Sequence, residues 1–280
     1  MHRTRPRMRI TATTTLAVVL GDPVEHSRSP ELHNAAFEAA GLDWVYTAVR
    51  VGEADVPAAL AAMRVLGVAG ASVTMPNKAA AALHADRRSP SVEVLGVANC
   101  LINRNGLIHA DNTDGIGFIQ GLFADCGASV DEKSVAIVGA GGAAKAIAQA
   151  CDLGGSAQVT IINRDRARAE EATLVAPRSG RVGSMSDIGG ADLVVNATPV
   201  GMLNDTSMPF DPTLIRTDAL LVDLIYSPVE TVLLASARAQ GVVGFNGMSM
   251  LIHQAAAQFE AWTGAEAPLI AMRNVFRGET

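Results

Sequence analysis

Lys78 and Asp114 are the two residues of this chain best placed to move a proton. Lys78 ends the stretch "GASVTMPNK" and opens an alanine-rich helix, and Asp114 follows "LIHA" and also precedes a helix. A lysine at the positive end of a helix dipole loses its proton more readily, which suits it for proton transfer. A carboxylate that meets it across a cleft can orient the amine, so the two residues predict an acid–base pair. Taken singly, they also fit a surface lysine in a first helical turn and a helix N-cap.

The stretch "HSRSP" places two serines around an arginine, shortly after the apolar run "LAVVLGDPV". We expect Ser29 to cap a helix that begins at Pro30, and we see no comparable structural role for Ser27. A helix N-terminus with two hydroxyls and free N–H groups can hold an anion. The stretch therefore predicts a carboxylate site, with a plain helix cap as the alternative.

The run "SVAIVGAGGAAKAIAQA" has the pattern of a dinucleotide-binding turn. Gly139, Gly141 and Ala144 stand in G-x-G-x-x-G/A spacing, after a predicted strand and at the start of a predicted helix. The first glycine permits the tight turn, the second lets the backbone approach a pyrophosphate, and the alanine allows helix and strand to pack closely. This context favours dinucleotide binding over a merely tight strand-to-helix turn.

The residues after the next predicted strand, "QVTII", bear on the choice of cofactor. Asn163 and Arg164 stand where NAD-binding proteins usually carry an acid for the ribose 2′-hydroxyl. Arg166 and Arg168 follow, and guanidinium groups suit a 2′-phosphate because they are planar, permanently charged and bidentate. The pattern favours NADP, but Asp165 keeps NAD open because its carboxylate could bond a 2′-hydroxyl or repel a phosphate. The arginines also fit a solvated helix face.

The elements that would position these residues follow a regular order. Short apolar runs rich in valine and isoleucine alternate with alanine-rich helical stretches along the chain. This alternation predicts βαβ units around largely parallel sheets, and so an α/β fold. A polar connector, "ASVDEK", precedes a new strand at Ser134, where we expect a second sheet to begin. Two amphipathic helices near the end of the chain find no strands left there, so we expect them to pack back on the first domain.

Composition limits the kinds of partner. The 280 residues are 49% hydrophobic and carry a formal net charge of −6 at pH 7. A nucleic-acid-binding protein would need a clustered basic face, so we expect a small-molecule partner. No apolar run is long enough to span a membrane. The basic start "MHRTRPRMR" precedes an apolar run too short for a signal peptide, so we expect a floppy tail and a cytoplasmic protein.

The three cysteines, Cys100, Cys126 and Cys151, form no CxxC pair and have no histidine at metal-ligand spacing. We therefore expect buried free thiols, no disulfide and no metal. The sequence leaves the oligomeric state open, because a monomer and a homodimer are both compatible with it.

Together the motifs resemble the shikimate dehydrogenase family from about Val19 to Phe276. They occur in the family's order as "GDPVEHSRSPELHN", "SVTMPNK", "GVANCLI", "ADNTDGIGF", "GAGGAA", "NRDRAR", "VVNATPVGM", "DLIYSPVETVLL" and "GMSMLIHQAAAQFEAWTG". The resemblance implies a two-domain oxidoreductase that reversibly reduces 3-dehydroshikimate to shikimate with NADPH, on the chorismate pathway to aromatic amino acids. It also implies that residues 1–114, with 250–280 packing back on them, form an α/β substrate-binding and catalytic domain. Residues 115–249 would form a Rossmann-type, doubly wound NADP-binding domain.

The resemblance assigns roles residue by residue. Lys78 and Asp114 would be the catalytic dyad, with Lys78 donating a proton to the forming alkoxide, and Ser27 and Ser29 would bind the substrate carboxylate. The other substrate-binding positions would be Thr74, Asn99, Asp114 itself, Tyr226 and Gln254. The cofactor-binding positions would be Gly139, Ala140, Gly141, Gly142 and Ala143 at the phosphates, Asn163, Arg164 and Arg168 at the 2′-phosphate, and Thr198, Leu224, Gly247 and Met250 at the adenine or nicotinamide ends.

Three residues depart from the family's usual pattern. Ser72 stands where an asparagine is usual and shortens a side chain near the substrate, and Asp165 replaces a common threonine in the adenine site. Ser249 replaces a glycine close to the expected nicotinamide pocket. Asp165 leaves the strictness of NADP over NAD open, and the sequence does not determine the effects of Ser72 and Ser249.

Four functions remain in competition. A quinate or quinate/shikimate dehydrogenase using NAD is the closest rival, although Ser29 favours shikimate because quinate-selective relatives often have threonine there. An aminoshikimate-type dehydrogenase could use the same pocket. A ligand sensor that kept the fold and lost catalysis is the rival from another class, and the presence of both Lys78 and Asp114 speaks against it.

Overall fold

The computed structural model describes residues 10–276, so the expected floppy tail at residues 1–9 lies outside the described part of the chain. The chain forms two compact units. The first comprises the residues up to Asp111 together with the segment from Ala255 onward, and the second comprises Asn112–Gln254. Because the chain crosses between the units twice, the last segment returns to the unit in which the chain began.

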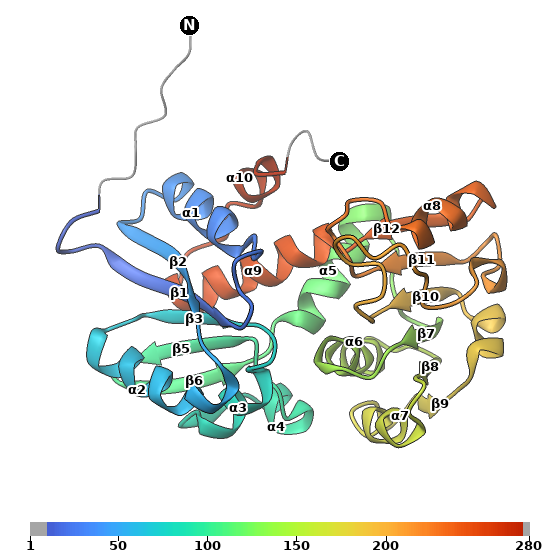
Figure 1. The fold of residues 1–280 in the computed structure, drawn as a ribbon, viewed down its shortest axis with the longest axis horizontal. Coiled ribbons are helices and arrows are strands. Elements are labelled where there is room, and N and C mark those ends of the chain that lie inside the picture. The colour runs from blue at the N-terminus through green and yellow to red at the C-terminus, as the bar shows by residue number, and fades with distance from the viewer. Residues whose placement is uncertain (1–9, 277–280) are drawn as a thin grey trace, which may run out of the picture. The chain divides into compact units, whose positions relative to one another are not determined.

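The first unit is built on a six-stranded sheet in the order β2-β1-β3-β5-β6-β4 (Figure 1). Its strands are β1 (Thr15–Gly21), β2 (Trp44–Arg50), β3 (Gly70–Val73), β4 (Arg87–Arg88), β5 (Cys100–Arg104) and β6 (Leu107–Asp111). The expectation of a largely parallel sheet is wrong on one side of β3, because β5 runs antiparallel to both β3 and β6. The turn between β5 and β6 is Asn105-Gly106, with φ of 55° and 87°, a pair that favours two-residue hairpins.

Helices cover this sheet on both faces. They are α1 (Ser29–Ala39), α2 (Val56–Leu66), α3 (Lys78–His84), α4 (Pro90–Leu95) and α10 (Leu269–Asn274), with a single 3₁₀ turn at Glu53–Asp55 and the second half of α9 (Met248–Thr263). Helix α1 contacts β1, β2 and α10, whereas α2, α3 and α4 contact β6. The apolar core under α2 and α3 includes Leu60, Met63, Val73 and Leu101, all nearly inaccessible to solvent.

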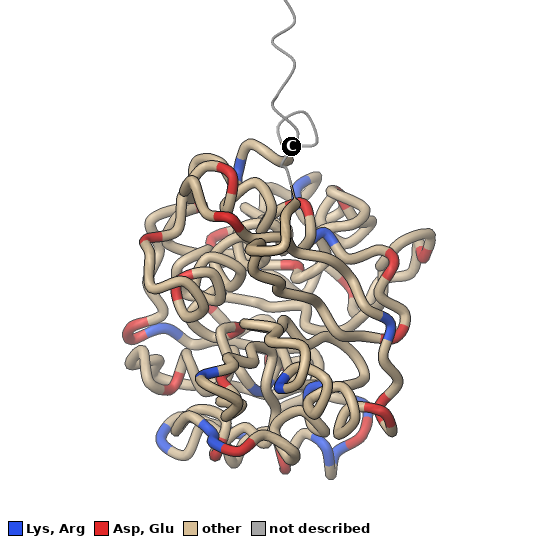
Figure 2. The backbone as a smooth tube through the Cα atoms, turned by 90° about the vertical axis from the view of Figure 1, so that its left-hand side faces the viewer, with Lys and Arg blue, Asp and Glu red and all other residues tan. Residues whose placement is uncertain are grey.

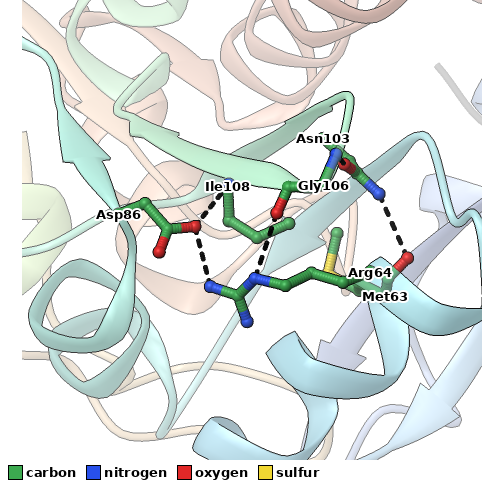
Figure 3. A network of polar contacts seen from close by, with 6 residues as sticks. All are labelled: Met63, Arg64, Asp86, Asn103, Gly106 and Ile108. Carbon is green, nitrogen blue, oxygen red and sulfur yellow. Dashed lines mark hydrogen bonds and ion pairs between the residues drawn. The ribbon is translucent and has the colours of Figure 1, made fainter.

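A network of polar contacts links α2 to the β5–β6 hairpin of the first unit (Figure 3). Asp86 accepts hydrogen bonds from the Arg64 guanidinium and from the Ile108 backbone N–H, both at 2.7 Å, and Arg64 Nε also donates to the Gly106 carbonyl. Asn103 Nδ2 donates to the Met63 carbonyl at 3.1 Å. The network ties the β5–β6 hairpin to the end of α2 and so holds the antiparallel part of the sheet in register.

The second unit is a doubly wound α/β fold, as expected. Its six strands are all parallel, in the order β12-β11-β10-β7-β8-β9. The strands are β7 (Ser134–Val138), β8 (Gln158–Ile162), β9 (Gly180–Val182), β10 (Leu193–Asn196), β11 (Leu220–Asp223) and β12 (Val243–Asn246). The helices are α5 (Asp114–Cys126), α6 (Gly142–Leu153), α7 (Arg166–Thr173), α8 (Val232–Ala239) and the first half of α9, with 3₁₀ turns at Met185–Gly190 and Pro212–Leu214. The four inner strands, β11, β10, β7 and β8, are buried along almost their whole length because helices pack on the sheet, whereas the edge strands β9 and β12 are partly exposed.

Charged residues of both signs, and the cysteines, are spread over residues 10–276. Figure 2 shows lysines and arginines interspersed with acidic residues along the backbone. All three cysteines are free, but Cys126 is exposed, which corrects the expectation that all three are buried. It is the last residue of α5, where the helix surface faces solvent. None of the described helices combines the length and apolar composition that crossing a membrane requires.

Candidate functional site

Five of the predicted site residues lie in the first unit: Ser27, Ser29, Thr74, Lys78 and Asn99. The other predicted site residues, including Asp114, lie in the second unit.

The helix-cap assignment of Ser29 is wrong. Helix α1 begins at Ser29 itself, its N-cap is Arg28, and no side chain caps it. The hydroxyl with a structural role is that of Ser27, whose Oγ accepts a hydrogen bond from the Ser29 backbone N–H at 3.3 Å. This bond uses a lone pair of Ser27 Oγ and leaves its proton to be donated. Ser29 is 9% exposed, so its hydroxyl sits at the border between the interior and the surface.

Thr74, Lys78 and Asn99 gather at the carboxyl end of β3. Thr74 is the first residue after that strand, and the turn it opens leads directly into α3, which begins at Lys78. The Lys78 carbonyl accepts from Ala98 N, and the Asn99 carbonyl accepts from Val73 N at 2.8 Å. In the turn, Asn77 is fully buried and its Nδ2 donates to the Val51 carbonyl. The start of α3 is therefore held by main-chain and side-chain bonds while Lys78 itself stays half-buried.

Asp114 is the first residue of α5 and is 5% exposed. It is not the N-cap that one reading of the sequence predicted, because Thr113 occupies that position. The Asn112 side chain accepts the Asp114 backbone N–H at 3.0 Å. The carboxylate is therefore not required for capping. Because Lys78 and Asp114 belong to different units, their pairing stays a prediction.

Helices α5 and α9 approach each other closely within the second unit. A Cβ on Gly117 would lie 2.6 Å from Cβ of Gln254, and one on Gly121 would lie 2.9 Å from the Met250 backbone nitrogen. These two glycines, one turn apart, let α9 lie close to α5 and so set where Met250 and Gln254 emerge. Ser249, the departure from the family pattern, donates its hydroxyl to Asp125 near the end of α5. Its side chain thus serves helix packing.

The glycine-rich turn forms an open cradle at the start of α6. Gly139 has φ of +120°, and a Cβ there would lie 2.8 Å from the Ala197 carbonyl oxygen, so only glycine fits. Gly141 is the N-cap, with no side-chain cap, and a Cβ there would meet nothing within 4 Å. Ala144 is fully buried at the contact between helix and sheet. Free N–H groups beside open space suit a phosphate group, so these residues fit a dinucleotide pyrophosphate.

The polar side chains that follow β8 have different hydrogen-bond and ion-pair partners. Asp165 Oδ1 accepts the backbone N–H groups of Ala167 and Arg168, so this carboxylate caps α7. Asn163 Nδ2 donates to the Asp165 carbonyl, and Arg166 pairs with Glu170 one turn on. Within residues 10–276, the exposed guanidinium of Arg164 makes no hydrogen bond or ion pair. Arg164 is therefore the cation of this turn best able to meet an incoming phosphate.

A buried polar cluster lies where β10 and β11 end. Asp223 is fully buried, and its carboxylate accepts from Asn196 Nδ2 at 2.9 Å, from Thr231 Oγ1 at 2.6 Å and from the Ile225 backbone N–H. Asn196 Oδ1 in turn accepts from both the backbone N–H and the hydroxyl of Thr198. Burial raises the pKa of Asp223, and the three donors oppose that rise. The cluster holds the loop that carries Thr198.

Leu224 follows the end of β11, and Gly247 follows the end of β12. The Leu224 backbone N–H donates to the Asn196 carbonyl, and a Cβ on Gly247 would overlap the Leu224 carbonyl oxygen. Only a glycine at 247 allows this approach of the two loops. Tyr226, half-buried, follows in the segment after β11.

Sequence reasoning missed Asn196, Asp223 and Thr231, which support the site without belonging to its predicted set. A signal was present, because each of the first two is a polar residue at the end of an otherwise apolar strand. At the carboxyl end of a parallel strand such residues face the crevice where ligands bind. Within residues 10–276, no three side chains of His, Cys, Asp or Glu come together as metal ligands would.

An all-parallel six-stranded sheet with a glycine cradle between its strand β7 and helix α6 defines a Rossmann-type α/β protein, and the first unit adds a mixed α/β sheet to it. Comparison with known proteins names the family. The shikimate dehydrogenase substrate binding domain matches residues 19–101, and the shikimate 5′-dehydrogenase C-terminal domain matches residues 247–275. The chain is 40% identical to shikimate dehydrogenase (NADP(+)) of Moorella thermoacetica, over 96% of this chain and 95% of that protein. The chain belongs to the shikimate dehydrogenase family.

Two solved structures illustrate the range of relatives. The shikimate 5-dehydrogenase of Thermus thermophilus, in complex with NADP(H) and shikimate, superposes with a TM-score of 0.89 at 32% identity, covering 95% of this chain and 100% of that one. The quinate dehydrogenase of Corynebacterium glutamicum, in complex with NAD, superposes with a TM-score of 0.87, also at 32% identity, covering 94% of this chain and 99% of that one. Both expected substrate classes therefore occur on this fold.

Proposed function

We propose that this chain is an enzyme that reversibly reduces 3-dehydroshikimate to shikimate with NADPH, on the route to chorismate and the aromatic amino acids. The observation that carries the proposal is its 40% identity, over 96% of the chain, to a protein named shikimate dehydrogenase (NADP(+)). In this proposal residues 1–114, with 250–280, bind the substrate, and residues 115–249 bind NADP. We further expect the enzyme to act in the cytoplasm on this small molecule, without a nucleic-acid partner.

The cofactor would be held by the second unit. Gly139 to Ala143 and the first turn of α6 would bind the pyrophosphate, Asn163, Arg164 and Arg168 the 2′-phosphate, and Thr198, Leu224, Gly247 and Met250 the adenine or nicotinamide ends. When bound, the nicotinamide supplies the hydride. Asp165 was the residue that kept NAD open, but its carboxylate already accepts two backbone N–H groups at the start of α7. A side chain used in this way is less available to a 2′-hydroxyl, which supports NADP.

The substrate would be held by hydroxyl and amide groups. Ser27 and Ser29 would bind the carboxylate, and Ser27 suits this because its lone pair takes the Ser29 N–H while its proton remains to be donated. Thr74, Asn99, Tyr226 and Gln254 would hold the ring hydroxyls or the carboxylate. The bonds at the end of β3 support this assignment, since they hold Thr74 and Asn99 next to the start of α3.

Lys78 would donate the proton that the carbonyl oxygen needs as it becomes an alkoxide, and Asp114 would orient the amine. General acid catalysis of this kind contributes roughly 10²–10⁴-fold to rate. Asp114 supports the assignment because it is largely buried at a helix start where the Asn112 side chain already accepts its backbone N–H. A quinate dehydrogenase using NAD is the second candidate, favoured by the superposition on such an enzyme.

One experiment tests the proposal and its rival together. We would measure kcat/KM for shikimate and for quinate, each with NADP and with NAD, on the wild type and on Lys78→Ala. The wild type should be most efficient with shikimate and NADP, and Lys78→Ala should lower kcat at least about 10²-fold with little change in binding. The exposed Lys133→Ala is the control. A preference for quinate with NAD would replace the proposal by its rival, and no turnover of any pair would favour a ligand sensor.

A further inference from the structure

A chain of buried hydrogen bonds runs through the interior of the first unit, which also carries several of the residues proposed to bind the substrate. The Tyr46 phenol donates to Ser72 Oγ at 2.6 Å, and Ser72 Oγ donates to Gln258 Oε1 at 2.5 Å. Gln258 Nε2 then donates to the Asn99 backbone carbonyl at 3.0 Å. These three side chains come from β2, β3 and α9, and none is more than 6% exposed.

The direction of every proton in this chain is determined at its Gln258 end. A backbone carbonyl can only accept, so the amide nitrogen of Gln258 must face Asn99 and the amide oxygen must face Ser72. Ser72 therefore has to donate its single proton to Gln258, and Tyr46 has to donate its own proton to Ser72. The Tyr46 oxygen is left as an acceptor, and the Ser29 side chain lies close enough to lower the pKa of the phenol against the effect of burial.

Both ends of the chain thus reach proposed substrate-binding residues. Ser29 lies at one end and Asn99 at the other, and Ser72 is two residues before Thr74. The Asn99 carbonyl accepts from both Val73 N and Gln258 Nε2, so both of its lone pairs are used. Loss of the Gln258 amide would leave one lone pair of the buried Asn99 carbonyl and the proton of the buried Ser72 hydroxyl unpaired, and unpaired buried polar groups carry a desolvation cost.

We propose that Gln258 is a positioning residue for the substrate: its amide sets the proton direction through Ser72 and Tyr46 and holds the Asn99 main chain in place. The inference rests on the proposed function, because it assigns Ser29 and Asn99 to the substrate. It also explains the short side chain at position 72. A serine leaves room for the Gln258 amide to reach between β3 and Asn99, where a longer side chain would fill that space.

The surroundings of Gln258 contain several titratable groups that stay neutral over the useful pH range. Burial lowers the pKa of His33 to about 3, with the Gln258 amide opposing the shift, and raises the pKa of Tyr46 and of the Cys100 thiol. The charge of Asp111 adds to the rise in the pKa of Cys100. Between pH 6 and 9 a carboxyl placed at 258 would therefore titrate without a neighbouring change of charge from His33, Tyr46 or Cys100.

The test uses Gln258→Glu, because glutamate has nearly the shape of glutamine but carries fewer hydrogen-bond donors. A neutral glutamic acid can accept from Ser72 and donate to Asn99, whereas the carboxylate can only accept, and burial raises the pKa of such a carboxyl. KM for shikimate at saturating NADP, taken relative to the wild type, should stay within about threefold at pH 6. It should rise roughly tenfold or more by pH 9, with kcat changed much less. Gln258→Met should raise KM at every pH, and the exposed Gln240→Glu should match the wild type.

The outcomes separate this inference from the proposed function. An active wild type whose KM is unchanged within twofold in both Gln258 variants overturns the inference alone. So does a variant that loses thermal stability and keeps the wild-type KM. A wild type that oxidises no shikimate overturns both. Fluorescence of Trp44 and Trp262, the only tryptophans of the chain, reports whether the first unit of each variant is folded.

Discussion

Arg164 and Arg166 stand two residues apart and have different surroundings, which makes them a matched pair. The Arg166 guanidinium pairs with Glu170 at 2.9 Å, whereas that of Arg164 has no partner within residues 10–276. Arg164→Ala should raise KM for NADP at least about tenfold and leave KM for NAD nearly unchanged, because one charged hydrogen bond to the 2′-phosphate is lost. Arg166→Ala should change neither, as exposed helix pairs contribute little. Equal rises for both cofactors in Arg164→Ala would contradict the 2′-phosphate assignment.

Several side chains in this protein have a role different from the one that the surrounding sequence suggests. Asp165 caps a helix where a cofactor contact was in question, and at the start of α1 it is Ser27, rather than the expected Ser29, whose hydroxyl accepts a backbone N–H. Both are short polar residues at helix starts, where several nearby N–H groups compete for one oxygen. Which side-chain oxygen accepts a given backbone N–H depends on backbone angles that the sequence does not reveal.

At the scale of elements, Asp223 joins the ends of β10 and β11 to the start of α8. Its carboxylate accepts from Asn196, Ile225 and Thr231, and the Thr231 hydroxyl in turn accepts from Leu234 N at the helix start. An asparagine at position 223 would point its NH₂ group, itself a donor, at one of these three donors.

We therefore expect Asp223→Asn to lower the free energy of unfolding of the second unit by about 2–3 kcal/mol. It should also raise KM for NADP, because the loops that carry Thr198 and Leu224 lose their anchor. Circular dichroism in urea and steady-state kinetics measure the two effects. Asp211→Asn is the control, since the exposed Asp211 caps a 3₁₀ turn with one oxygen that an amide can replace. A variant with wild-type stability would show that the buried carboxylate is not the anchor.

At the scale of the whole molecule, a buried histidine links stability to pH. His33 is fully buried, stacks on the Tyr46 ring at 4.5 Å and lies 4.8 Å from the Trp262 ring. Neither of its ring nitrogens has a hydrogen-bond partner by the usual distance and angle limits. Burial lowers its pKa from 6.5 to about 3. Between these values the unfolded chain holds the His33 proton and the folded chain does not, so the stability that is present above pH 6.5 is lost as pH falls.

Each pH unit in the lower part of that window should cost about 1.4 kcal/mol of unfolding free energy from this one group. His33→Phe should flatten the dependence between pH 6 and pH 4 while keeping the ring stack. Urea unfolding followed by tryptophan fluorescence measures this directly, because both tryptophans belong to the first unit. The exposed His84→Gln should keep the wild-type slope. A His33→Phe variant as acid-sensitive as the wild type would contradict the assignment.

Much of the fold followed from local pattern. The doubly wound sheet and the glycine cradle were predicted because strand, turn and helix signals lie within about 30 residues of each other. The antiparallel β5–β6 pair was missed, although Asn105-Gly106 is a strong hairpin signal between two apolar runs. Once read, it would have corrected the expectation of a largely parallel first sheet.

The sequence by itself determined the α/β class, the phosphate cradle and the family, because each depends on residue types at fixed short spacings. Only the tertiary structure decided which oxygen caps each helix and that Asp223 anchors three elements. It alone placed Tyr46, Ser72 and Gln258 in one hydrogen-bonded chain, although 186 residues separate Ser72 from Gln258. The physical reason is that a proton's direction depends on every partner in contact, and those partners are brought together only by folding.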